Sequence, residues 1–113
     1  MNDKEKLLYA ILDNTISCCE LEVSGTGTLS ITREDVLGKS RAENLVMTRC
    51  ILAAQLVHAG YSITTIAGLL NRSIPAVRHL VRMDRDYIDT SRAYRIASAQ
   101  ATLLNKDIEP CGL

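Results

Sequence analysis

Apolar residues recur at intervals of three and four along most of the chain, which is the spacing of a helical face and not of a strand. Helices are predicted at residues 3–20, 31–37 and 42–59, with Gly60 as a typical helix end, and at about 86–104. The apolar positions of these segments expected to face the core are Leu7, Leu8, Ile11, Leu12, Ile16, Cys19, Leu45, Ile51, Leu52, Ala53, Leu56, Val57, Tyr87, Tyr94, Ala97, Ala101 and Leu104.

A tighter pattern lies between the second long helix and the last one. Ser62 and Ser73 each precede a short apolar-periodic run, and both are good N-cap residues. Asn71 lies in the turn between the runs and tolerates the left-handed backbone conformation. Pro75 would be the second residue of the later helix, where its missing N–H costs little. Residues 63–82 are therefore predicted to form a helix-turn-helix.

The organisation of the whole chain follows from these elements. Residues 1–107 are predicted to form one all-α domain, a compact bundle of five to six helices. Glycine, serine and threonine gather at 23–30, which predicts a connector. Thr32 and Asp35 have a spacing close to that of a capping box at the start of the short helix. Residues 108–113 lack periodicity and are expected to form a flexible tail.

Charge is divided unevenly, although the formal net charge is +0. Residues 1–38 carry 3 Lys and Arg against 7 Asp and Glu, whereas residues 39–95 carry 9 against 4. All the positive residues of the middle section are Arg except Lys39. Because Arg presents a planar fork of donors to phosphate or guanine, this section is the one suited to a nucleic-acid partner.

The predicted helix-turn-helix divides its side chains between two faces. Val77 and Leu80 fall on the inward face of its second helix, which leaves Arg78, His79 and Arg82 to point away from the core. A helix that enters a major groove needs apolar anchors on one side and long donors on the other. The pattern therefore predicts binding of double-stranded DNA.

Residues 31–82 resemble the C-terminal duplex-binding domain of the bacterial replication initiator DnaA, which is similar to a Trp-repressor-like fold. The stretch ITREDVLGKSR resembles that family's short helix and basic link, and the chain also matches at Arg49, at Ser62-Ile63 and at Ile66. Where the family has the signature R-D-H-T-T-V, this chain has RSIPAV at 72–77.

The resemblance implies DNA contacts from the link, the long helix and the turn. His79 and Arg82 match family positions, whereas Arg78 differs from the family type and is a candidate for new readout. Among the residues that replace the signature, only Ser73 has a side chain able to hydrogen-bond, so altered or relaxed sequence preference is expected. The expected DNA-binding residues are Lys39, Arg41, Arg49 (a minor-groove or phosphate contact), Arg72, Ser73, Arg78, His79 and Arg82.

The sequence also allows an alternative function for the helix-turn-helix. Ile74 and Pro75 are apolar where a residue should face solvent or groove, which suits a degenerate helix-turn-helix that acts as a protein-interaction or dimerisation module. Its partner would be a second copy or a replication or regulatory protein.

Other classes find little support in the sequence. An enzyme is not expected, because the chain has neither a Gly-rich phosphate loop nor a nucleophile motif. No metal or other cofactor is expected, since the four cysteines lack C-x-x-C spacing. Without a signal peptide or a long apolar run, the chain is expected in the cytoplasm, associated with the nucleoid if it binds DNA, with its cysteines as free thiols.

Overall fold

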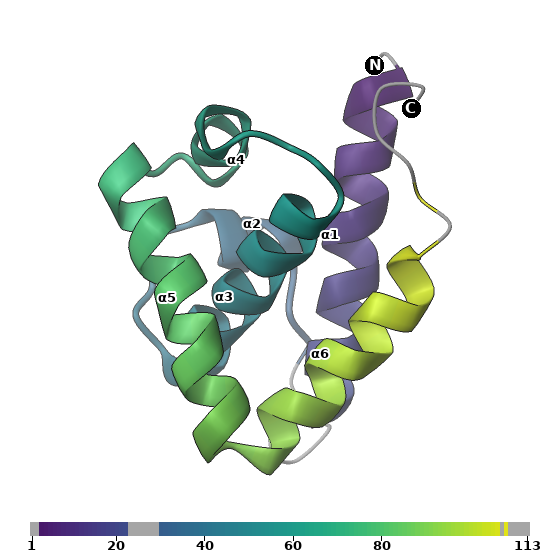
Figure 1. Ribbon diagram of the computed structural model, residues 1–113, viewed down its shortest axis with the longest axis vertical. Helices are drawn as coiled ribbons and strands as arrows, with labels where there is room; N and C mark the ends of the chain where they lie inside the picture. Colours follow the sequence, from purple (N-terminus) through teal and green to yellow (C-terminus); the bar gives the residue numbers. More distant parts are fainter. Residues whose placement is uncertain (1–2, 23–29, 107, 109–113) are drawn as a thin grey trace.

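The computed structural model describes residues 3–22, 30–106 and 108, and within this part of the chain the protein is all-helical. In Figure 1, α3 lies between α5 on the left and α1 on the right, and α6 packs against α1. The helices are α1 (Asp3–Glu22), α2 (Arg33–Leu37), α3 (Glu43–His58), α4 (Ile63–Leu70), α5 (Ile74–Thr90) and α6 (Arg92–Asn105).

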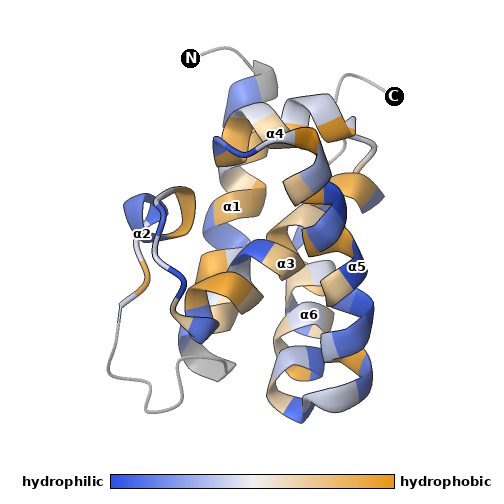
Figure 2. Ribbon diagram, turned by 90° about the vertical axis from the view of Figure 1, so that its left-hand side faces the viewer, coloured by the Kyte–Doolittle hydropathy of each residue, from blue (hydrophilic) through white to orange (hydrophobic). Residues whose placement is uncertain are grey.

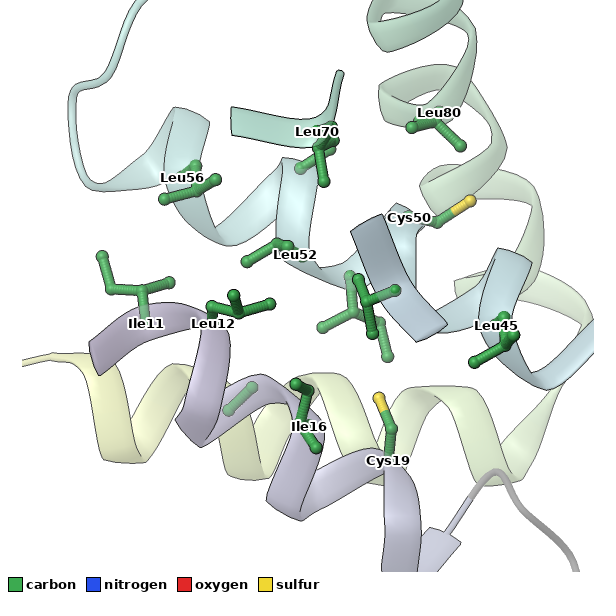
Figure 3. Close-up of a cluster of buried hydrophobic side chains, with 14 of the residues drawn as sticks. Ile11, Leu12, Ile16, Cys19, Leu45, Cys50, Leu52, Leu56, Leu70 and Leu80 are labelled. Atoms are coloured by element: carbon green, nitrogen blue, oxygen red, sulfur yellow. The ribbon is translucent and has the colours of Figure 1, made fainter. Parts of the chain in front are cut away.

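Helix α3 is the centre of the bundle. All of its residues from 48 to 56 are buried, so every face of this stretch is covered by other parts of the chain. Figure 3 shows Leu52 and Leu56 of α3 facing Ile11 and Leu12 of α1. These four side chains are fully buried. The predicted all-α fold is confirmed, and most of the buried apolar side chains are aliphatic, although the largest fully buried one is Tyr94.

Two residues expected in the core lie on the surface instead. Val57 is 39% exposed and Leu104 is 53% exposed. Next to Leu104, the inward position belongs to Asn105, which accepts a hydrogen bond from Asn14 Nδ2 (2.9 Å) and donates one to Gln55 Oε1 (3.2 Å). A polar network between α1, α3 and α6 therefore occupies the place that the apolar pattern assigned to leucine.

The boundary between the last two helices differs from the prediction. A new helix was expected from about residue 86, but α5 continues to Thr90 and α6 begins at Arg92. No Gly or Pro interrupts α5 in this stretch, and Tyr87 and Ile88 keep packing against the core. The break comes at Ser91, which has an extended backbone and whose hydroxyl accepts from the Tyr94 N–H (3.2 Å) as the N-cap of α6.

A buried carboxyl lies where α5 meets α6. The Tyr94 hydroxyl donates a hydrogen bond to Asp84, and the Tyr94 ring stacks on Tyr87 with 5.0 Å between centroids. Burial raises the pKa of Asp84 above its ordinary value, while the bond from Tyr94 acts in the opposite direction. Tyr94 is fully buried, so its ring is part of the bundle core.

The short helix α2 begins with the predicted capping box. Asp35 N–H donates to Thr32 Oγ1 (3.0 Å), and Thr32 N–H donates to Asp35 Oδ2 (3.0 Å). Most of the predicted connector at 23–30 lies outside the described residues. Of the expected tail, Ile108 is described: it is half-buried, and its N–H donates to the Asn105 carbonyl (2.9 Å). Flexibility of residues 109–113 stays a prediction, because they lie outside the described part.

Candidate functional site

The turn between α4 and α5 has the local geometry that its residues predict. Asn71 adopts the left-handed conformation (φ 53°, ψ 48°) and ends α4. Ser62 and Ser73 cap α4 and α5, with hydroxyl oxygens accepting from the Thr65 and Ala76 N–H groups at 3.2 and 3.3 Å. These local hydrogen bonds set the direction in which α5 leaves α4.

The outward face of α5 is basic in its N-terminal half. Arg78, His79 and Arg82 are exposed as predicted, and none of them makes a hydrogen bond or ion pair in the described structure. Arg85 continues the same stripe and is also exposed. Sequence reasoning left Arg85 out, although its spacing of seven residues from Arg78 places it on the same helical face. Figure 2 shows hydrophilic, blue segments recurring along α5.

The remainder of that face differs at its two ends. Asp86 and Asp89 are exposed in the C-terminal half, so the positive character fades toward the α6 junction. Ile74 (37% exposed) and Pro75 are exposed in the first turn, beside the exposed Ser73 cap. The part of α5 best suited to a polyanion is therefore its N-terminal half.

A second basic surface segment is the link between α2 and α3. Lys39 and Arg41 are exposed, and neither has a hydrogen-bond partner in the described structure. The link ends at Ala42, the N-cap residue of α3, whose N–H donates to Ser40 Oγ (3.3 Å). The charged groups of Lys39 and Arg41 are thus available to solvent, and their contact with DNA stays a prediction.

Arg49 corrects the expectation of a direct DNA contact, because it is only 4% exposed. Its Nε donates to the Val36 carbonyl (2.7 Å) and its Nη1 to the Ser40 carbonyl (2.6 Å). Its Nη2 donates to the carbonyls of Asp35 (3.0 Å) and Gly38 (3.1 Å). Four of the five guanidinium N–H groups therefore hold the end of α2 and the link. This arginine positions the basic link and exposes almost none of its own side chain.

Arg72 joins the turn to the same link. It is half-buried, and it donates to the Leu70 carbonyl (2.9 Å) and to the Gly38 carbonyl. The Gly38 oxygen therefore accepts from both Arg49 and Arg72. Burial lowers the pKa of Arg49 from its ordinary value, and the nearby positive charge of Arg72 lowers it further. The link and the α4–α5 turn are consequently tied into one unit.

Other kinds of site are not evident in the described chain. Its residues include no group of three His, Cys, Asp or Glu placed to hold a metal ion. Cys18, Cys19 and Cys50 are buried free thiols, and burial raises the pKa of Cys19 and of Cys50 to about 12, so both stay protonated at neutral pH. Among the helices that the structure describes, none combines the length and the apolar character needed to cross a membrane.

Known proteins provide no further evidence on the role of these residues. The chain matches no family model, no curated protein and no solved structure. The resemblance to the DnaA duplex-binding domain stays a prediction.

Proposed function

We propose that this protein binds double-stranded DNA, with α5 as a recognition helix and the basic link as a second contact. The observation that carries the proposal is the row formed by Arg78, His79 and Arg82 on the N-terminal half of α5, exposed and without partners in the described structure. In helix-turn-helix proteins, the N-terminal residues of the second helix contact base edges in the major groove.

The dimensions of α5 suit this role. At about 1.5 Å per residue, its 17 residues extend over roughly 25 Å, and the basic stripe occupies about 10 Å of that length. A major groove about 12 Å wide admits one α-helix. Arg78 and Arg82 are one helical turn apart and can contact neighbouring bases or phosphates, while Lys39 and Arg41 of the link contact the backbone.

The chemistry of the first turn of α5 supports relaxed or altered sequence preference. Ile74 and Pro75 offer only apolar contact, for example with a thymine methyl group. The Ser73 oxygen is occupied by the Ala76 N–H, although its hydroxyl proton can still be donated. Discrimination between bases therefore falls mainly on Arg78, His79 and Arg82.

The test is a fluorescence anisotropy titration of a labelled mixed-sequence duplex between about 50 and 200 mM NaCl, where counterion release makes phosphate-dependent binding fall steeply. The double variant Arg78→Gln/Arg82→Gln should weaken binding and lower the log-log salt slope by about 2, one for each lost phosphate contact. The matched control is Arg92→Gln on α6, an exposed arginine away from the stripe. The control removes one positive charge and the double variant removes two, so weakening by Arg92→Gln of half the size or more would assign the effect to net charge and reject α5 as the contact.

A complete absence of binding at low salt would reject DNA binding itself, since even non-specific complexes have Kd values of about 10⁻⁴ to 10⁻⁶ M at physiological salt. The alternative of a protein-interaction or dimerisation module would then take its place. The exposed apolar residues Leu103 (67%) and Leu104 (53%) of α6 are the side chains that such a module would use.

A further inference from the structure

A hollow of about 340 Å³ lies between the basic link, the α4–α5 turn and the helices α3 and α5. Its apolar wall is formed by Val46 and Leu80, and none of its lining residues is acidic. The polar residues that line it are Lys39, Ser40, Arg41, Arg49, Asn71 and Arg72.

Four of these side chains are cationic, and no described acidic group is paired with any of them. The single ion pair within the described residues joins Arg33 to Asp13, away from the lining. Arg49 is buried, and its positive charge and that of Arg72 repel each other. Uncompensated like charges at a partly buried place are unfavourable, so an anion seated between them would be stabilised.

The roles of the two inner arginines differ. Arg49 donates four N–H groups to backbone carbonyls, so it supplies positive potential and fixes the wall of the hollow. Arg72 uses one N–H on each of two carbonyls, which leaves three of its five without a described partner.

Further donors come from the rim of the hollow. The Lys39 ammonium and the Arg41 guanidinium are exposed and have no described partner. The Ser40 hydroxyl accepts from Ala42 N–H and can donate its own proton, and Asn71 adds a side-chain amide.

This combination favours a tetrahedral oxyanion over a carboxylate. Several donors approach from the link on one side and from the turn on the other, and a phosphate group presents acceptor oxygens in all of these directions. A volume of about 340 Å³ falls at the lower end of the range for small-molecule pockets. The apolar wall can contact whatever carries the phosphate group.

We propose that the hollow between the basic link and the α4–α5 turn is a phosphate-binding site. The phosphate belongs either to a free phosphate ester or to the backbone of a bound duplex, and the second source rests on the proposed DNA binding. Arg72 and Lys39 donate directly to the phosphate oxygens, whereas Arg49 holds the site in shape.

The probe is inorganic phosphate, titrated into the isotope-labelled full chain at constant ionic strength, with chloride as the reference anion. Amide resonances at 38–41 and 71–73 should shift and saturate with phosphate but not with chloride. Arg72→Gln should lower the phosphate affinity at least tenfold. Lys39→Gln should lower it severalfold, and it serves as a second variant because the exposed Lys39 makes no described hydrogen bond that the fold would lose. Arg92→Gln is the matched control and should bind phosphate like the wild type.

Shifts equal to those with chloride, or an affinity unchanged in both Arg72→Gln and Lys39→Gln, would overturn the site. Adding a short duplex at fixed phosphate then identifies the source. Displacement of phosphate indicates the duplex backbone, and simultaneous binding indicates a free phosphate ester.

The two proposals fail in distinguishable ways. A phosphate site that survives while no duplex binds at low salt refutes only DNA binding. Duplex binding that is unaffected by Arg72→Gln and Lys39→Gln, with no saturable phosphate shifts, refutes the site and the backbone contact of Lys39, but it leaves DNA binding through α5 in place.

Discussion

Replacing Arg49 with Met removes a guanidinium while keeping a long unbranched stem in the core. The four carbonyls that it serves belong to Val36, Ser40, Asp35 and Gly38, and the bond to Val36 is the buried one. An unsatisfied buried acceptor costs roughly 1–3 kcal/mol, and each part-buried carbonyl that returns to water costs about 0.5–1 kcal/mol. Relief from burying a charge offsets part of this loss. We expect Arg49→Met to lose about 2–4 kcal/mol of unfolding free energy, or roughly 8–16 °C in Tm.

Urea unfolding followed by circular dichroism measures this loss as a shift in midpoint at constant m. Arg49→Lys retains the charge, but a single ammonium cannot span four carbonyls, so it should recover little of the stability. Arg82→Met is the control and should change stability by less than about 0.5 kcal/mol, because Arg82 is exposed. A loss below about 1 kcal/mol for Arg49→Met would show that the link does not depend on the guanidinium. Full recovery by Arg49→Lys would show that charge matters and the fork geometry does not.

Three further predictions concern stability, each measured by thermal or urea unfolding. Gly38→Ala should cost about 1–3 kcal/mol, because its Cβ would lie 2.8 Å from the Glu34 carbonyl oxygen. Gly68→Ala, with nothing within 4 Å of its Cβ, should gain about 0.5–1 kcal/mol in α4. A stability change of the same sign in both variants would contradict the role of the Glu34 contact. The raised pKa of Asp84 means that the folded state binds its proton more tightly than the unfolded chain, so this group's contribution is present below about pH 3.8 and is lost as pH rises through the folded pKa. Asp84→Asn should lack this decline in stability with rising pH. Stability-pH curves that run parallel for the variant and the wild type would refute this effect of Asp84. Ser91→Ala should cost about 1 kcal/mol as a lost N-cap of α6, and a cost no larger than that of an exposed Ser→Ala elsewhere would rule the cap out.

Local hydrogen bonds explain why so much of the fold could be predicted from sequence. The Thr32 capping box and the Ser62 and Ser73 caps all join residues three apart, and the left-handed Asn71 depends on its own turn. Interactions of this range leave a direct trace in the order of residue types. The start of the helix predicted at 86–104 was wrong, although the Ser91 cap is an equally local signal of a helix start. The apolar spacing through Tyr87 was assigned to this last helix, whereas Tyr87 belongs to α5.

Tertiary contacts explain what could not be predicted. Arg49 was expected to contact the minor groove or a phosphate because it matches an arginine of the family that the chain resembles, but its environment is set by carbonyls 9 to 14 residues earlier in the chain. Asn105 is buried because Asn14 and Gln55, distant in sequence, complete its hydrogen bonds. Among the candidate contacts, the exposed stripe on α5 follows helical spacing and was predictable, whereas the cationic hollow depends on how Arg72 meets the link.

The carbonyl of Gly38 accepts hydrogen bonds from both Arg49 and Arg72, and it thereby holds the link at a defined position relative to the α4–α5 turn. The spacing between the link and the start of α5 depends on these contacts, so we expect a change in the length of the link to weaken one or both of the guanidinium contacts. Any partner that binds both the link and α5 must match that spacing, and a ligand that displaces the link also acts on the turn that directs α5.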